Sequence, residues 1–254
     1  MKALIVTLVA FALILTPAVA AKVPKVSPTP VPRTPKPASP EEAAAAVAAV
    51  KEAKDEKELL AAIKHLGEVY YPKNPSTVKL ALSLVMDDKQ SVKARSGAAG
   101  VLGKFRDGSV VPQLNKYVID PRVKREVALS SALATALGEI AHPTSIVPLK
   151  KLADYKETPV AVASTKALGK IEDKRTIDEL IKIFDKTEDS DAPSSSRQRR
   201  YAQVSVAARA ALISITKESF ESAAEYRKWW KENQKDFTFE PPKPAPTPPA
   251  AKGR

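Results

Sequence analysis

The sequence predicts an all-α fold, an α-solenoid of about five helical hairpins, and two periodic features support this. A Leu-Gly pair recurs at the end of successive alanine-rich segments, at Leu66-Gly67, Leu102-Gly103, Leu137-Gly138 and Leu168-Gly169, with intervals of 36, 35 and 31 residues. Six positions before each glycine stands a small residue: Ala61, Gly97, Ala132 and Ala163. Repeats of this length are typical of stacked helical hairpins. We expect the small residues to allow close helix packing and each glycine to end its helix in a left-handed conformation.

The helices of successive hairpins can be aligned. The predicted first helices lie in segments 107–118, 142–153 and 173–184, and a serine or threonine near each start is the expected N-cap: Ser109, Ser145 and Thr176. The predicted second helices are 92–105, 123–140 and 158–171. In the fifth unit an insertion at 187–200 separates a helix at 175–186 from one at 200–215.

A final helix at 221–237 is rich in aromatic residues. Tyr226 and Trp230 are four residues apart and therefore share a face. We expect this helix to cover the last hydrophobic face of the array, although an aromatic ligand platform is the alternative.

An acidic residue, a short gap, valine, a basic residue and an alanine-rich helix ending in Leu-Gly together resemble a HEAT repeat. Asp88 with Val92-Lys93, and Asp120 with Val123-Lys124, carry this pattern best. The resemblance covers residues 41–237, and the Trp-Trp helix is similar to the one that closes several exported bacterial HEAT proteins. It implies a ladder between repeats formed by Asp88, Asp120 and Asp154 with Lys93 and Lys124. Ala161 follows Val160 in the fourth unit, so that rung is expected to be missing.

The chain begins with the pattern of an export signal. Lys2 precedes an apolar run at 3–16, Pro17 breaks it, and Ala18-Val19-Ala20 suits a signal peptidase. The sequence therefore predicts a signal peptide at 1–20 and a periplasmic or extracellular protein; an uncleaved membrane anchor is the alternative. Because cysteine is absent, disulfides and a lipidated N-terminal cysteine are excluded, so the chain is not a lipoprotein.

The predicted array is flanked by two proline-rich, basic segments, a linker at 21–40 and a tail at 238–254. Neither contains enough apolar residues to form a core, so both are expected to be disordered and extended. Together, residues 1–40 and 241–254 carry eight basic residues and no acid. The formal net charge of +12 therefore falls to +4 for the body of the chain. Nucleic acid is accordingly not an expected partner.

No motif in the sequence indicates catalysis, and the chain is predicted not to be an enzyme. Phosphate-binding loops, dinucleotide-binding glycine patterns and hydrolase or metalloprotease motifs are absent, so neither a cofactor nor a catalytic residue is assigned. His65 and His142 alone cannot form a three-histidine zinc site. We expect His65 to be exposed on a helix and His142 to cap or turn the chain between repeats.

Binding of another protein is the predicted function. The second helices should line the concave side of the array, where the candidate partner-binding residues are Lys93, Arg95, Lys104, Lys124, Arg125, Lys166 and Lys170. A second candidate is the cluster Arg197, Arg199 and Arg200 in the predicted insertion. Ordinary solubilising charge, and a flexible loop, are the respective alternatives.

The sequence leaves three functions open. The first is a non-catalytic extracytoplasmic scaffold for protein–protein interaction. The second is a binder of anionic envelope polymer, either cell-wall polysaccharide or lipopolysaccharide, acting through the basic tails and loop. The third follows because HEAT-like arrays also occur in bilin lyases, which are enzymes; the lack of cysteine and of a histidine on a pocket face disfavours it.

Overall fold

The computed structural model describes residues 39–69, 75–188 and 195–239, all within the compact unit Pro35–Arg254. The predicted signal peptide, nearly all of the proline-rich linker and most of the C-terminal tail lie outside the described residues. In the described ranges the chain forms twelve α-helices and two short 3₁₀ helices, and no strand. The predicted all-α solenoid is confirmed.

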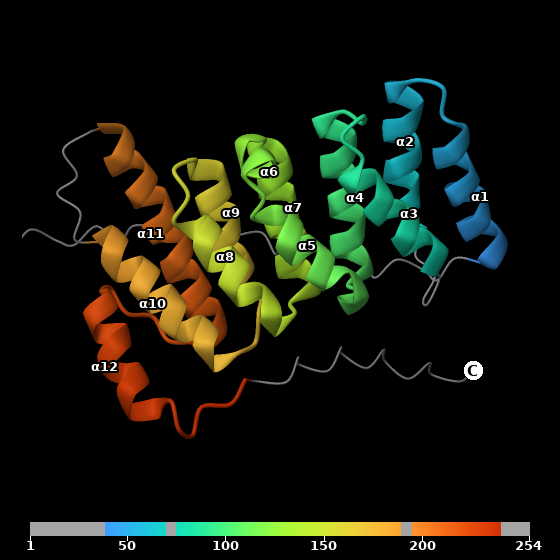
Figure 1. Cartoon of the computed structure of the whole chain (residues 1–254). Helices are drawn as coiled ribbons and strands as arrows, with labels where there is room; N and C mark the ends of the chain where they lie inside the picture. The colour runs from blue at the N-terminus through green and yellow to red at the C-terminus, as the bar shows by residue number, and fades with distance from the viewer. Residues whose placement is uncertain (1–38, 70–74, 189–194, 240–254) are drawn as a thin grey trace, which may run out of the picture. The chain divides into compact units, whose positions relative to one another are not determined.

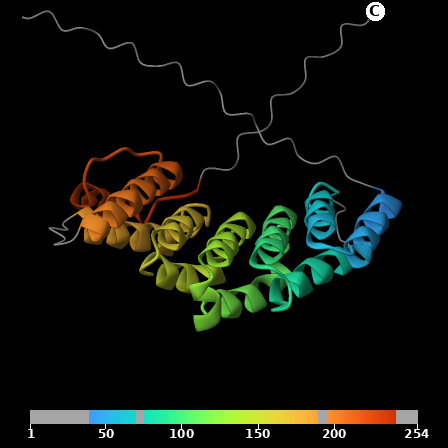
Figure 2. The same ribbon diagram turned by 90° about the horizontal axis from the view of Figure 1, so that it is seen from above.

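The hairpins form two layers (Figures 1 and 2). The first helices of the five hairpins are α1 (Pro40–Glu52), α3 (Pro75–Met86), α5 (Val111–Val118), α8 (Ile146–Ala153) and α10 (Lys174–Glu188). The second helices are α2 (Glu56–Leu66), α4 (Val92–Phe105), α7 (Val127–Ile140), α9 (Thr158–Leu168) and α11 (Ser195–Thr216). Figure 2 shows the second helices on the concave side of the described array, as predicted.

The core lies between the two layers. The leucine of each Leu-Gly pair is almost completely buried, as is Leu212 at the matching position of α11. Leucines of the first helices, such as Leu114 and Leu149, meet them from the other layer and are also fully buried. Burying such a side chain is worth about 1.5–3 kcal/mol, so these leucines hold the layers together.

The glycines of the Leu-Gly pairs act through close packing, and the predicted left-handed helix ends are wrong. A Cβ atom on Gly138 would lie 2.6 Å from the Cα of Ala167, and one on Gly103 would lie 3.0 Å from the Cα of Ala136. None of the described glycines has a positive φ; Arg106 (φ 52°) and Ala141 (φ 57°) adopt the left-handed conformation at the ends of α4 and α7. Each glycine is therefore the contact point for the next second helix.

A short 3₁₀ helix precedes α5 and another precedes α8, and neither is capped by the predicted residue, Ser109 or Ser145. Asp107 caps η1 (Gly108–Val110), and His142 caps η2 (Pro143–Ser145), where its Nδ1 accepts a hydrogen bond from the Thr144 N–H. Ser145 is buried and forms no side-chain cap hydrogen bond to α8. The cap lies two or three residues earlier than expected because an acidic or imidazole acceptor reaches the N–H two positions ahead. The turn role expected for His142 is confirmed.

The predicted helix at 123–140 is interrupted at Glu126. Its backbone (φ −85°, ψ 81°) leaves the helical region, which separates α6 (Pro121–Arg125) from α7. The sequence around this residue favours a continuous helix, so the break is a tertiary effect. The Glu126 carboxylate accepts a hydrogen bond of 2.8 Å from Arg95 of the preceding hairpin.

The aromatic capping helix is α12 (Ala223–Asn233), and it packs against α10. The fully buried Tyr226 ring lies edge-on against Phe184 and Phe220, with centroid distances of 6.2 and 4.9 Å. The Trp230 Nε1–H donates a hydrogen bond of 2.7 Å to Asp178 of α10. Tyr226 and Trp230 are thus used in packing, and the helix caps α10, the last helix of the convex layer.

Candidate functional site

The packing of the second helices determines which of their side chains reach the concave side. The glycine position faces the next hairpin, and the leucine before it faces the core. At 3.6 residues per turn, the positions ten and three before the glycine and one after it point away from the core. Fourteen of the fifteen residues at these positions are exposed, and the other is half-buried.

We call these fifteen residues the concave strip. In chain order they are Lys57, Lys64, Glu68, Lys93, Gly100, Lys104, Ala128, Thr135, Glu139, Pro159, Lys166, Lys170, Gln203, Ala210 and Ser214. Six are lysines and two are glutamates, and the remaining seven are small or uncharged. The strip is therefore a basic surface in which mostly small side chains lie between the lysines. Such a surface suits a partner that carries acidic groups and can approach the helices closely.

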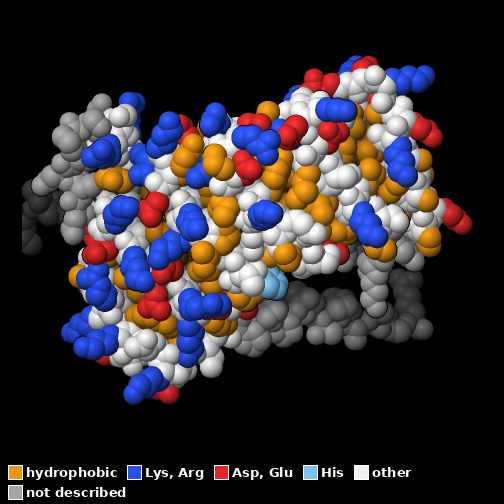
Figure 3. Space-filling view, viewed as in Figure 1, with side chains coloured by type: hydrophobic (Ala, Val, Ile, Leu, Met, Phe, Trp, Pro, Cys, Tyr) orange, Lys and Arg blue, Asp and Glu red, His pale blue; other side chains and the backbone are white. Residues whose placement is uncertain are grey.

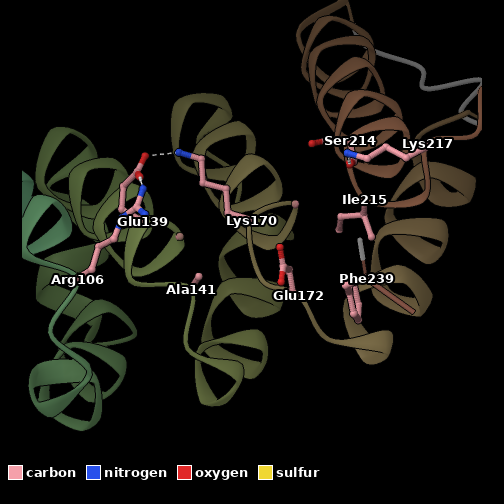
Figure 4. Close-up of a pocket in the computed structure, with 11 residues that line it drawn as sticks. Arg106, Glu139, Ala141, Lys170, Glu172, Ser214, Ile215, Lys217 and Phe239 are labelled. Atoms are coloured by element: carbon pink, nitrogen blue, oxygen red, sulfur yellow. Dashed lines mark hydrogen bonds and ion pairs between the residues drawn. The ribbon is translucent and has the colours of Figure 1, made fainter. Parts of the chain in front are cut away.

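A hollow of about 580 Å³ lies at one edge of the concave strip, where α7, α9 and α11 end (Figure 4). Its walls include the glycine positions 138 and 169, and its apolar part is formed by Ile215 and Phe239. Helix carboxyl ends carry partial negative charge, and Arg106, Lys170 and Lys217 place cationic groups beside it.

Glu139 is the centre of the ion pairs in this hollow. Its carboxylate pairs with Lys170 of the next hairpin and, at 3.5 Å, with Arg106 of the preceding one. Figure 4 shows these side chains at one wall, with Glu172 and Phe239 further along the hollow. Such exposed pairs contribute little stability, and a partner can replace them.

The lining of this hollow contains few groups that act as nucleophiles. Its lining includes no histidine and, apart from the exposed Ser214, no residue with a nucleophilic hydroxyl or thiol. The described residues include no group of three or more histidines, aspartates or glutamates placed to hold a metal ion.

The structure brings four of the predicted partner-binding residues onto one surface. Lys93, Lys104, Lys166 and Lys170 are exposed members of the concave strip. Lys124 and Arg125 lie on α6, outside the strip; the Lys124 ammonium is 5.6 Å from the centre of the Tyr155 ring, and Arg125 is exposed.

The prediction that Arg95 binds a partner is wrong, because this residue is only 3% exposed. Its guanidinium donates hydrogen bonds to the Val85 carbonyl oxygen, Glu126, Asp88 and the Tyr117 hydroxyl. Burial alone would lower the pKa of Arg95, but the hydrogen bonds and charges of Tyr117 and Glu126 outweigh it and raise the pKa. Arg95 therefore joins two hairpins and is not accessible to a partner.

The prediction that residues 197–200 lie in a loop is also wrong, because α11 begins at Ser195 and these residues belong to its first turns. Arg197 and Arg199 are exposed. Arg200 is half-buried and donates to the carbonyl oxygens of Ala153 and Tyr155, at 3.2 and 2.7 Å. It anchors α11 to the preceding hairpin.

The ladder that the resemblance implied is formed only in part, by Asp88 with Arg122 and by Asp154 with Lys186, and therefore with other basic residues than expected. Asp88 pairs with Arg95 at 3.3 Å and Arg122 at 3.8 Å, and Asp154 pairs with Lys186 at 2.6 Å. Asp120 caps its own helix and pairs with Arg122. The fourth unit thus has a connection to the fifth through Asp154, although Lys93 and Lys124 do not supply the rungs.

The sequence did not single out a second basic region, on the convex side. Figure 3 shows lysine and arginine side chains gathered over α8, α10 and α12. Between α8 and α10 a groove of about 460 Å³ has Ile146 and the exposed Val147 in its lining. Glu179 bridges Lys150 and Lys182 there; burial would raise its pKa, but the two lysines hold it below its usual value. The helical spacing of these lysines in α8 and α10 could have predicted this region from the sequence.

The hairpins are antiparallel and stacked, and the glycine of each Leu-Gly pair contacts the next second helix. This arrangement defines an α-solenoid. A sequence profile of HEAT repeats matches residues 127–198, which comprise α7, α8, α9, α10 and the start of α11. This part of the chain therefore contains HEAT repeats, as the resemblance indicated. Comparison with curated proteins found no match. No described helix combines the length and the apolar character needed to cross a membrane.

Proposed function

We propose that the protein is a non-catalytic, extracytoplasmic scaffold that binds another protein on its concave strip. HEAT-repeat solenoids generally serve protein interaction through extended concave surfaces. The observation that carries the proposal is the concave strip itself: six exposed lysines around small residues, with the hollow at Glu139 and Lys170 at its edge. We expect the partner to present acidic groups to it.

The extracytoplasmic location is supported by the sequence of the first 20 residues. The basic start, apolar run and Ala-Val-Ala ending are typical of a cleaved export signal. Cell fractionation followed by N-terminal sequencing tests this part of the proposal: it requires an exported chain that starts at Ala21, and a chain that retains Met1 inside the cell would contradict it.

A photo-crosslinking experiment tests the surface. A photoreactive amino acid replaces Thr135 on the concave strip or, as a control, Lys116 on the exposed side of α5. The cells are irradiated, and crosslinked proteins are identified by mass spectrometry. The proposal requires a partner that crosslinks at position 135 and not at 116.

Charge reversal tests the role of the lysines. The double variant K93E/K166E alters the concave strip, and K116E/K151E makes the same change in net charge on the convex side. We expect the concave variant to weaken capture of the crosslinked partner by about tenfold or more, and the convex variant to leave it unchanged. Equal losses would indicate nonspecific attraction and contradict the proposed surface.

Binding of anionic envelope polymer is the competing function, and it depends on the tails. Deleting residues 22–40 and 241–254 removes every basic residue outside the body except Lys2, which belongs to the predicted signal, and leaves the concave strip intact. Retained partner capture with this variant supports the scaffold. Loss of a salt-sensitive association with isolated envelopes, with no partner crosslinked at position 135, would favour the polymer binder.

A further inference from the structure

The last helix of the concave layer leaves one side uncovered. In the first four hairpins, the side of the second helix that contains the glycine is covered by the next second helix. In α11 the matching position is Ile213, which is 36% exposed, and Val206 seven residues earlier is 70% exposed. Ala202 and Ala210 on the same side are exposed as well. We call Ala202, Val206, Ala210 and Ile213 the end face.

The capping helix does not cover the end face. α12 packs mainly against α10, and Tyr226 and Trp230 contact Phe184, Phe220 and Asp178. The segment after α11 reaches only one edge of it, where Arg209 donates to the Phe220 carbonyl oxygen and to Glu221. Terminal repeats of solenoids normally carry a polar outer side, so an apolar one is suited to bind a partner.

The other end of the array has the properties that this partner needs. α1 has an exposed side formed by Glu41, Ala45, Ala49 and Glu52, in which small residues lie between acidic ones. Small residues allow a helix to approach closely, as Ala136 and Ala167 do within the array.

The two ends are also complementary in charge. The exposed side of α1 carries Glu41 and Glu52, whereas Arg199 lies seven residues before Val206, on the same side of α11 as the end face, and α11 contains no acidic residue. Two copies of α11 placed against each other would bring like charges together, which disfavours a symmetric pair. An α1 helix on the end face would take the place that the next second helix occupies in the first four hairpins.

We propose that the protein associates head to tail, with α1 of one copy seated on the end face of the next. Because each copy keeps one free end of each kind, the contact does not close and generates a linear assembly. This assembly would present several concave strips in a row. It does not depend on the proposed function of that strip, although Ala210 borders both surfaces.

Sedimentation velocity of the purified protein over a wide range of concentration tests the proposal. We expect the wild-type protein to form progressively larger species as the concentration rises, and added salt to weaken this association. The single variants V206D and A45R should each weaken it by about tenfold or more. V147D is the matched control, because Val147 is 62% exposed but lies on the convex side of α8.

A mixture of the two variants distinguishes head-to-tail association from other arrangements. V206D retains a functional α1 and A45R a functional end face, so an equimolar mixture should form a dimer and nothing larger. Circular dichroism checks that both variants are folded, which their exposed positions favour. A wild-type protein that stays monomeric at every concentration would overturn the proposal. So would an A45R variant that associates as the wild type does, since that result would indicate pairing of two end faces.

Discussion

Arg95 is the one charged residue that is almost fully buried among the described residues, and it joins two hairpins. Its four hydrogen-bond acceptors come from α3 and the residues after it, from α5 and from the break before α7. The break at Glu126 interrupts a helix, and the carboxylate at this break reaches Arg95. Regular helix geometry is thus lost at this point, and an interaction between repeats is gained.

We expect Arg95→Ala to lower the free energy of unfolding by about 2–4 kcal/mol, because it leaves a cavity and removes hydrogen bonds to partly buried acceptors. Arg95→Lys keeps the charge without the planar fork of donors and should have an intermediate effect. Arg106→Ala is the control: Arg106 is 70% exposed and pairs with Glu139 at 3.5 Å, so its loss should be nearly neutral. Urea denaturation measures all three. An Arg95→Ala variant as stable as Arg106→Ala would contradict this role.

Tyr226 should make stability depend on alkaline pH. Burial raises the pKa of its phenol, and the hydroxyl donates to the Glu218 carbonyl oxygen at 2.9 Å. The folded chain therefore holds this proton more tightly than the unfolded chain, whose tyrosines titrate near about 10. The stabilisation is complete below that pH and is lost as the pH rises through the higher pKa of the folded state.

The variant Tyr226→Phe separates the two contributions of the hydroxyl. At neutral pH it should be less stable than the wild type by about 1 kcal/mol, because the carbonyl loses its donor. Above a pH of about 10 the wild type should lose further stability relative to the variant, since only the wild type must bury a group that tends to ionise. Urea denaturation at neutral and alkaline pH measures this difference. A constant difference across that range would show that Tyr226 does not titrate on unfolding.

At the scale of helices, two glycines of similar sequence context have opposite roles. Gly138 touches Ala167 of the next second helix, so Gly138→Ala should force the hairpins apart and cost about 1–3 kcal/mol. Gly100 lies in the concave strip, where an added Cβ atom would meet no other atom within 4 Å, so Gly100→Ala should stabilise α4 by about 0.5–1 kcal/mol. Thermal unfolding of the two variants measures both changes. Stabilisation by both substitutions would mean that helix propensity, not packing, sets the outcome.

The sequence predicted the hairpins and the concave lysines because both depend on helical periodicity. The same periodicity could have excluded Arg95, which lies seven residues before the core residue Leu102 and hence on the same side of α4. The break at Glu126 and the early start of α11 were not predictable in this way. The first depends on a contact with another hairpin, and the second on how a serine- and arginine-rich segment packs against Tyr155.

At the scale of the whole array, each hairpin packs against its neighbours. A change in one hairpin should therefore alter the stability of the adjacent hairpins more than that of distant ones. In a linear array the total stability is close to a sum of repeat and interface contributions. The aromatic cap covers Phe184 of α10 and Phe220 after α11. Removing it should therefore weaken the C-terminal hairpins first.

We expect a chain that ends after Phe220 to show faster amide hydrogen exchange in α10 and α11 and unchanged exchange in α4. The substitution Tyr226→Ala should have the same effect in a milder form. Loss of the buried tyrosine ring costs about 3–5 kcal/mol at the site, which opens the adjacent hairpin before the distant ones. Hydrogen exchange with mass spectrometry resolves the helices separately. Lys116→Ala, which changes an exposed residue of α5, serves as the control and should alter neither region. An equal increase of exchange in α4 would show that the array unfolds as a single cooperative unit, with strong coupling across all five hairpins.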